Sequence, residues 1–139
     1  MTNHQNTQLG FTIRLGSDFQ SALTATVEAL KAEGFGVLTE IDVQDTMRKK
    51  LGVELAPYRI LGACNPALAH RALTAAPEVG LLLPCNVTVR QLEDGGIEVA
   101  IIDPLMMLGV VANPALSPIA DEARQKLERV AQSLSALPH

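Results

Sequence analysis

The spacing of apolar residues switches repeatedly between two periods along this chain, and the switching constrains the fold more than any other sequence feature. Three segments alternate apolar and polar residues, as half-buried β-strands do: Leu9–Leu15, Gly36–Val43 and Ile97–Asp103. Between Ser17 and Gly34, apolar residues instead recur every three to four positions, which is the period of an amphipathic helix. A chain that carries both periods folds by covering a sheet with helices.

Capping residues predict where the first two long helices begin and end. Ser17 followed by Gln20 is typical of a capping box, and Gly34 is a natural terminating residue. Asn65 and Pro66 predict the start of a second helix, with Asn65 at the N-cap and Pro66 in the first turn. We expect this second helix to continue to about residue 76.

The other elements follow from the same signals. In chain order they are a short helix over Asp45–Leu51 ended by Gly52, a strand over Tyr58–Ala63, a long strand over Leu81–Leu92, a turn over Glu93–Gly96 and an apolar connector over Pro104–Asn113. Ser117 and Pro118 are expected to open the last helix. Its predicted inner stripe is Ile119, Ala123, Leu127, Val130 and Leu134.

These elements predict an α+β two-layer sandwich, with a largely antiparallel sheet and the helices on one face. The chain has 139 residues, which suits one domain, and we place that domain at residues 9–137 after a polar N-terminal tail at 1–8. The open face would carry Thr88, Arg90 and Glu98. An open face or an exposed edge strand favours a homodimer.

Composition argues against several classes of function. Aromatic residues make up only 3% of the chain, which disfavours stacking on single-stranded nucleic acid, and the net charge of −4 disfavours binding to duplex phosphates. We find neither a signal peptide nor an apolar run near the length of about 20 residues that a membrane helix needs. The two cysteines are expected to be free thiols in a cytoplasmic protein. No nucleotide-binding motif is present.

Two segments, GACNP at 62–66 and LLLPCNV at 81–87, each place a cysteine directly before an asparagine. Cys64 precedes the predicted N-cap Asn65, and the positive end of a helix dipole favours the reactive thiolate. Cys85 lies on the inward face of a predicted strand that is a candidate neighbour of the strand before Cys64. A redox pair, a soft-metal site and a covalent nucleophile are the functional interpretations. Two small buried hydrophobic side chains are the structural one.

Further residues are weaker candidates for the same site. Asp103 ends a strand, where a carboxylate either caps a turn or lines the mouth of a pocket. Met106 and Met107 follow it, and methionine with cysteine suits copper(I), although methionine more often fills gaps in a core. His70 projects away from the inner stripe of its helix, as a solvated surface residue does. Because neither Cys-Asn segment contains an aromatic residue, we expect leucine, valine, methionine and alanine to wall any site there.

Four segments together resemble a known prokaryotic family, catalogued as domain of unknown function 302: Ile41–Glu54, Pro57–Leu73, Val79–Arg90 and Asp103–Leu108. The resemblance extends from about Gly10 to Leu134. The matching positions are Tyr58, Gly62, Cys64, Asn65, Pro66, His70, Leu82, Pro84, Cys85, Asn86, Asp103 and Pro104. The resemblance implies an α+β fold with a layout like that of the TATA-binding protein, and a homodimer. It implies no established activity and no DNA binding.

The sequence therefore favours a homodimeric binding module for a small ligand or a soft metal ion. The expected site residues are Cys64, Asn65, Cys85, Asn86 and Asp103, with Tyr58, His70, Met106 and Met107 as weaker candidates. One alternative is a thiol-dependent enzyme or redox protein that uses Cys64 as the nucleophile and Cys85 as the resolving thiol. Another alternative is a structural interaction protein without a small-molecule site. The sequence identifies no cofactor.

Overall fold

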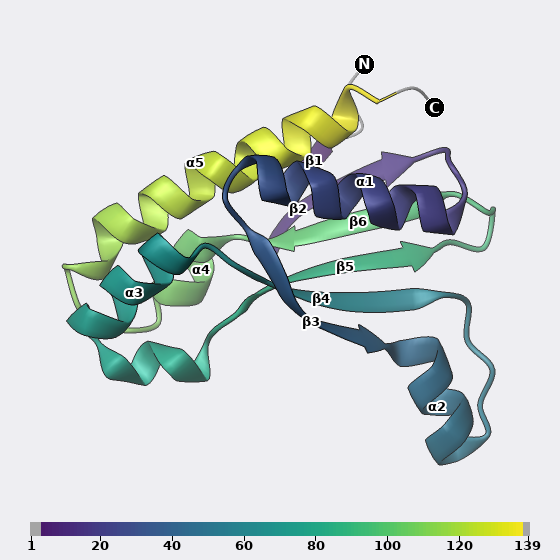
Figure 1. The fold of residues 1–139 in the computed structure, drawn as a ribbon, viewed down its shortest axis with the longest axis horizontal. Coiled ribbons are helices and arrows are strands. Elements are labelled where there is room, and N and C mark those ends of the chain that lie inside the picture. The colour runs from purple at the N-terminus through teal and green to yellow at the C-terminus, as the bar shows by residue number, and fades with distance from the viewer. Residues whose placement is uncertain (1–3, 138–139) are drawn as a thin grey trace.

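The computed structural model describes residues 4–137 and has two layers, a six-stranded sheet and a set of helices (Figure 1). In chain order the elements are β1 (His4–Asn6), β2 (Gly10–Leu15), α1 (Phe19–Ala32), β3 (Gly36–Asp42), α2 (Val43–Leu51), β4 (Tyr58–Cys64), α3 (Pro66–Ala75), the 3₁₀ helix η1 (Pro77–Leu81), β5 (Cys85–Gln91), β6 (Ile97–Ile102), α4 (Pro104–Leu108) and α5 (Leu116–Ser135). The predicted α+β two-layer sandwich is confirmed.

The sheet has the strand order β1-β2-β6-β5-β4-β3, and each neighbouring pair is antiparallel. Its register aligns the inward-facing residues into rows, such as Val89 of β5 opposite Val99 of β6. Side chains of these rows are fully buried, and alternate residues such as Thr88 and Arg90 are only partly buried. The alternation read from the sequence therefore separates a core face from an open face, as predicted.

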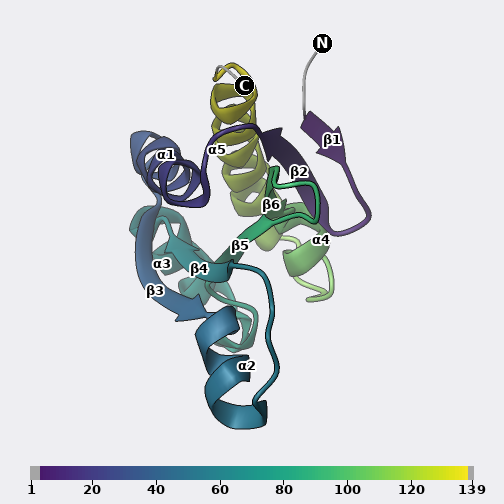
Figure 2. The ribbon, with the colours of Figure 1, turned by 90° about the vertical axis from the view of Figure 1, so that its right-hand side faces the viewer.

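Helices α1 and α5 lie over the same face of the sheet (Figures 1 and 2). The predicted inner stripe of α5, from Ile119 to Leu134, is buried in full. Helix α1 ends where it was predicted to end, since Gly34 adopts a positive φ of 85° just after the helix. A side chain at that position would be strained, so glycine suits it.

The predicted starts of α1 and α5 are corrected by the structure. Asp18, not Ser17, is the N-cap of α1, and its carboxylate accepts hydrogen bonds from the Ser21 backbone N–H at 2.8 Å and the Ser21 hydroxyl at 2.9 Å. An ionised carboxylate is a stronger acceptor than a hydroxyl, which explains the shift of one residue. Helix α5 begins at Leu116 without a side-chain cap, one residue before the predicted Ser117.

Two segments between the predicted elements also differ from expectation. Residues 81–84 do not extend the long strand, because η1 ends at Leu81 and β5 begins only at Cys85. Pro84 has no N–H to donate to a strand, which accounts for the late start. The connector after β6 contains the short helix α4, capped by Asp103. Residues 4–6, placed in the tail by their polarity, form β1 beside β2.

Strand β3 and helix α2 form close to where they were predicted, but Val43, expected at the end of the strand, begins α2, and β3 is mostly exposed rather than half-buried. Helix α2 projects away from α1 and α5 (Figure 2). Gly52 ends α2 in the left-handed conformation, with a φ of 67°. No residue of α2 is buried, and several large apolar side chains of this region are exposed: Leu38, Ile41, Leu51, Val53 and Leu55. Across residues 4–137, we find no helix with the length and apolarity to cross a membrane.

Candidate functional site

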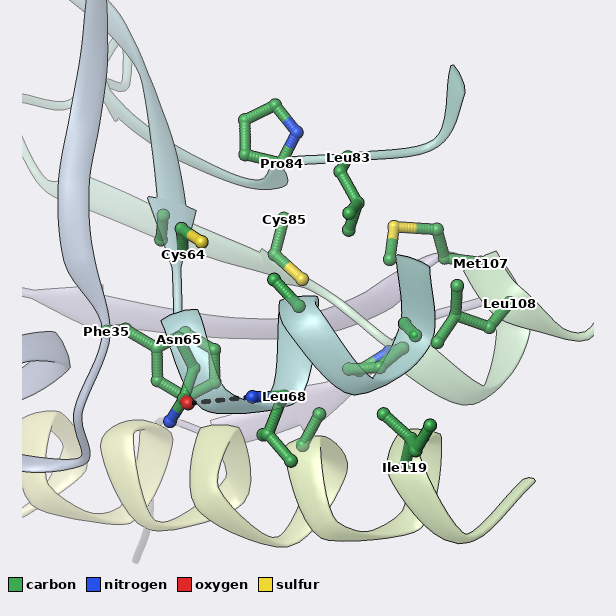
Figure 3. A pocket seen from close by; sticks show the side chains of 15 residues that line it. Phe35, Cys64, Asn65, Leu68, Leu83, Pro84, Cys85, Met107, Leu108 and Ile119 are labelled. Atoms are coloured by element: carbon green, nitrogen blue, oxygen red, sulfur yellow. Dashed lines mark hydrogen bonds between the residues drawn. The ribbon is translucent and has the colours of Figure 1, made fainter. Parts of the chain in front are cut away.

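Neighbouring strands β4 and β5 bring the two Cys-Asn segments together. Ala63 lies opposite Cys85 in the antiparallel register, so Cys64, the last residue of β4, is adjacent to the start of β5. Figure 3 shows the two thiols directed into one hollow beside helix α3. The expectation that these strands are neighbours is therefore confirmed, although the two cysteines lie far apart in the sequence.

The hollow is a small pocket between the end of the sheet and helices α3, α4 and α5. Its cavity volume is about 40 Å³, and because a water needs about 10–15 Å³ on this measure, the cavity has room for roughly three water molecules. Fifteen residues line it: Phe35, Ala63, Cys64, Asn65, Leu68, Ala69, Ala72, Leu83, Pro84, Cys85, Pro104, Met107, Leu108, Ile119 and Ala123. Apart from Asn65 and the two thiols, this lining is apolar.

Asn65 lines the pocket and forms hydrogen bonds to two elements. Its side-chain oxygen accepts a hydrogen bond from the Leu68 backbone N–H at 3.2 Å, which confirms its predicted role as the N-cap of α3. Its amide group also donates to the Glu33 carbonyl at 3.5 Å, next to the end of α1. Asn65 therefore ties α1 to α3 and fixes Cys64 at the N-terminal end of α3.

The two thiols have different surroundings. Cys85 is 8% exposed, and its burial, with a smaller contribution from nearby Cys64, raises the pKa of its thiol to about 11. Cys85 is therefore neutral near pH 7, because removal of solvent penalises the charged thiolate. Cys64 is only partly buried and is the more accessible of the pair. A neutral, buried thiol attacks slowly, so Cys85 is poorly suited to act as a resolving cysteine.

Met106 and Met107 are adjacent in α4 but differ in burial. Met107 is 9% exposed and lines the pocket, whereas Met106 is 36% exposed and is not among the lining residues. Met107 therefore adds a third sulfur atom to the pocket wall, on the α4 side (Figure 3). Of the two candidate methionines, only Met107 lines the pocket.

An aromatic ring also lines the pocket, contrary to the sequence prediction that only aliphatic residues would wall it. Phe35, between α1 and β3, is 2% exposed and contributes its ring to one end of the cavity (Figure 3). It was missed because it belongs to neither Cys-Asn segment. Its position between two glycines gave no local signal, and the ring reaches the pocket because the next residue, Gly36, pairs with Cys64 across β3 and β4.

Asp103 does not reach the pocket, although it was a principal site candidate. Its carboxylate caps α4 by accepting from the Leu105 backbone N–H at 2.9 Å, and it forms an ion pair with Arg124 of α5 at 3.2 Å. The capping alternative considered for this residue is the one that the structure favours. The neighbouring Pro104, which was not predicted as a site residue, lines the pocket instead.

Asn86 and Tyr58 point to the other face of the sheet. They line a separate, more open hollow of about 310 Å³, together with Thr88, Arg90 and Glu98. The alternation along β5 explains this, since Cys85 faces inward and its neighbour Asn86 faces outward. The second Asn of the two Cys-Asn segments is therefore not part of the thiol pocket.

His70 is exposed on α3, as its position away from the inner stripe predicted. The pocket therefore holds neither imidazole nor carboxylate. In the part of the chain that the structure describes, no group of three or more His, Cys, Asp or Glu side chains could hold a metal ion. Any metal bound at the pocket would depend on sulfur ligands.

Comparisons with known proteins assign the chain to a family. Residues 11–134 match the family described as "Domain of unknown function DUF302". A solved structure of an uncharacterized conserved DUF302 protein from Bacillus stearothermophilus is similar, with 30% sequence identity, a TM-score of 0.84, and coverage of 92% of this chain and 99% of that one. A search of curated proteins found no match. The family resemblance deduced from the sequence is confirmed, and the chain belongs to the DUF302 family.

Proposed function

We propose that this protein is a homodimeric binding module that holds a small ligand or a soft metal ion in the pocket between Cys64 and Cys85. The observation that carries the proposal is the small, partly open apolar pocket with two thiols in its wall. Binding sites are typically concave and apolar, with a few polar groups that fix the orientation of the ligand. Two free thiols also suit a reducing, cytoplasmic location.

The size of the pocket limits the occupant. A cavity of about 40 Å³ accepts an ion or a guest of a few atoms, because typical pockets for drug-sized ligands measure about 300–1,000 Å³. The Asn65 side chain already has its hydrogen-bond partners in Leu68 and Glu33. The occupant therefore meets sulfur atoms, methyl groups and one aromatic ring, which favours a soft or apolar guest over a strongly polar one.

Xenon is a suitable probe of the cavity, since dry apolar cavities bind it. Crystals pressurised with xenon are expected to show one xenon atom per chain beside the thiols. The Ala69→Met variant should abolish this site, because Ala69 lines the pocket. Ala67→Met is the matched control, since Ala67 lies exposed on the same helix. Absence of xenon from the wild-type pocket would contradict the proposal that the cavity admits a guest.

The homodimer is supported by the exposed apolar side chains of the β3–α2 region. Strand β3 is an edge strand, and its residues Leu38 and Ile41 are 67% and 48% exposed. An edge strand with exposed apolar residues invites pairing with another chain. Sedimentation velocity should give a dimer for the wild type and a weaker dimer for Leu38→Lys. The control Leu81→Lys, at a 90% exposed site on η1, should remain dimeric. A monomeric wild type would refute the proposed homodimer.

A further inference from the structure

We propose that the pocket is a copper(I) site in which the thiolates of Cys64 and Cys85 are the two principal ligands and the Met107 thioether is a third. The inference rests on the proposed binding function and names the class of its ligand, a soft monovalent metal ion. Sulfur-bearing side chains from three elements line the same cavity: Cys64 at the end of β4, Cys85 at the start of β5 and Met107 in α4.

The donor set selects the metal. Thiolate and thioether sulfur are soft ligands that bind copper(I) strongly, whereas magnesium, calcium and manganese prefer carboxylate, carbonyl and water oxygen. Two side-chain oxygen ligands that the sequence predicted for the site have other partners, since the Asp103 carboxylate is bound to Leu105 and Arg124 and the Asn65 oxygen is bound to Leu68. A metal ion in the cavity would therefore meet sulfur and hydrocarbon.

The number of ligands separates copper(I) from zinc. Structural zinc is almost always held by four ligands in a tetrahedron. Among residues 4–137, no group of three or more His, Cys, Asp or Glu side chains could hold a metal ion. Copper(I) is stable with two or three sulfur ligands. A cavity of about 40 Å³ is large enough for such an ion.

The N-terminal end of α3 favours the negative charge that the site would acquire when it binds copper(I). Binding breaks two S–H bonds, releases two protons and forms two Cu–S bonds, so the bound centre carries one net negative charge. Cys64 directly precedes the N-cap of α3, a ten-residue helix whose N-terminal end is the positive end of its dipole (Figure 3). Partial exposure of Cys64 provides an entry route for the ion.

An anaerobic titration of the reduced protein against the coloured copper(I)–bicinchoninate complex tests the inference. The wild type is expected to remove one copper(I) per chain, and Cys64→Ser or Cys85→Ser should abolish this stoichiometric binding. Cys85→Ala is a second variant for the buried position, because a hydroxyl there is costly in an apolar site. Met107→Leu should weaken binding by about tenfold or more, the loss typical of groups that support a metal, while Met106→Leu should match the wild type.

The outcomes separate the copper inference from the binding proposal. If xenon enters the pocket but copper(I) is not retained, the copper site is wrong and the binding pocket stands. If neither enters, both proposals fail. Equal copper(I) binding by the wild type and Cys64→Ser would place the ion elsewhere and overturn the site. Equal binding by Met107→Leu and Met106→Leu would remove Met107 from the ligand set.

Discussion

Gly62 occupies a position in β4 where the structure leaves no room for a side chain. A Cβ atom built there would lie 2.7 Å from the Cγ atom of Pro84 and would also collide with the Thr39 hydroxyl. Thr39 is exposed and its side chain can rotate, whereas the Pro84 Cγ atom can move only by a change of ring pucker or with its backbone. Because Pro84 lines the thiol pocket, a substitution at Gly62 tests how closely the sheet and the pocket wall fit together.

We expect Gly62→Ala to destabilise the protein by about 1–2 kcal/mol. Overpacking typically costs about 1–3 kcal/mol, and the reduced entropy of the unfolded chain returns about 0.4–1 kcal/mol when alanine replaces glycine. With a urea m-value of about 2 kcal/mol/M, the midpoint of unfolding should fall by roughly 0.5–1 M. The same substitution at Gly36 of β3 is the control, since a Cβ there meets nothing within 4 Å.

Equilibrium unfolding in urea, followed by circular dichroism, measures both variants under one set of conditions. Gly36→Ala should be as stable as the wild type or slightly more stable. A Gly62→Ala variant with the stability of Gly36→Ala would show that Pro84 and β4 are not packed as closely as described. It would also remove the reason given for the rigid pocket wall on that side.

Three further predictions follow from the surroundings of individual residues. The pKa of Cys85 is raised to about 11, above the ordinary thiol value of 9.0. The contribution of this neutral, buried thiol to the free energy of unfolding is therefore complete below pH 9 and is lost as the pH rises toward 11. Between pH 9 and pH 11, the free energy of unfolding measured in urea should therefore fall on the order of 2 kcal/mol further for the wild type than for Cys85→Ala. Parallel pH profiles of the two proteins would contradict the burial of the thiol. Asp103→Ala should cost about 1–2 kcal/mol through the lost cap and ion pair and leave copper(I) affinity unchanged, as measured by unfolding and titration; loss of copper binding in a folded Asp103→Ala protein would return this residue to the site. Phe35→Ala should cost about 3–5 kcal/mol, as truncation of a buried aromatic ring does, and a thermal unfolding profile like that of the wild type would show that the ring does not fill the end of the pocket.

Much of the fold was predictable because the hydrophobic pattern repeats with little ambiguity. The alternation in β2, β5 and β6 and the inner stripe of α5 each bury the residues expected of them. The helix ends at Gly34 and Gly52 were predictable because glycine alone takes a positive φ without strain. The position of the N-cap of α1 was wrong because the adjacent residues Ser17 and Asp18 are both good capping residues, and the sequence pattern does not distinguish them.

The candidate site was predictable only in part. The sequence identified Cys64, Asn65, Cys85 and Met107, and the pairing of β4 with β5 unites both cysteines in one pocket. The sequence motifs grouped residues that are adjacent in the chain. Adjacent residues of a strand face opposite sides of the sheet, and only the structure shows which residues of neighbouring strands share a side. Asn86 was therefore grouped with Cys85, although they face opposite sides of β5.

Residues brought in by long-range packing left no signal in the sequence. Phe35 comes from the loop after α1, and Ile119 and Ala123 come from α5, near the other end of the chain. Each reads locally as an ordinary core residue. Only the docking of α5 against α3 and α4 closes the pocket around the thiols, and no single segment records that arrangement.

The claim on which the proposed site depends is that Cys64 and Cys85 share one pocket in solution. Arsenite tests it directly, because arsenic(III) bridges two thiols that lie together, forming two As–S bonds and releasing two waters. Mass spectrometry of the reduced protein should show one arsenic per chain, and both thiols should become unreactive toward maleimide. Cys64→Ser and Cys85→Ser should retain none. Capture of arsenic by either single-cysteine variant, or a wild-type protein that keeps both thiols reactive, would contradict the shared pocket.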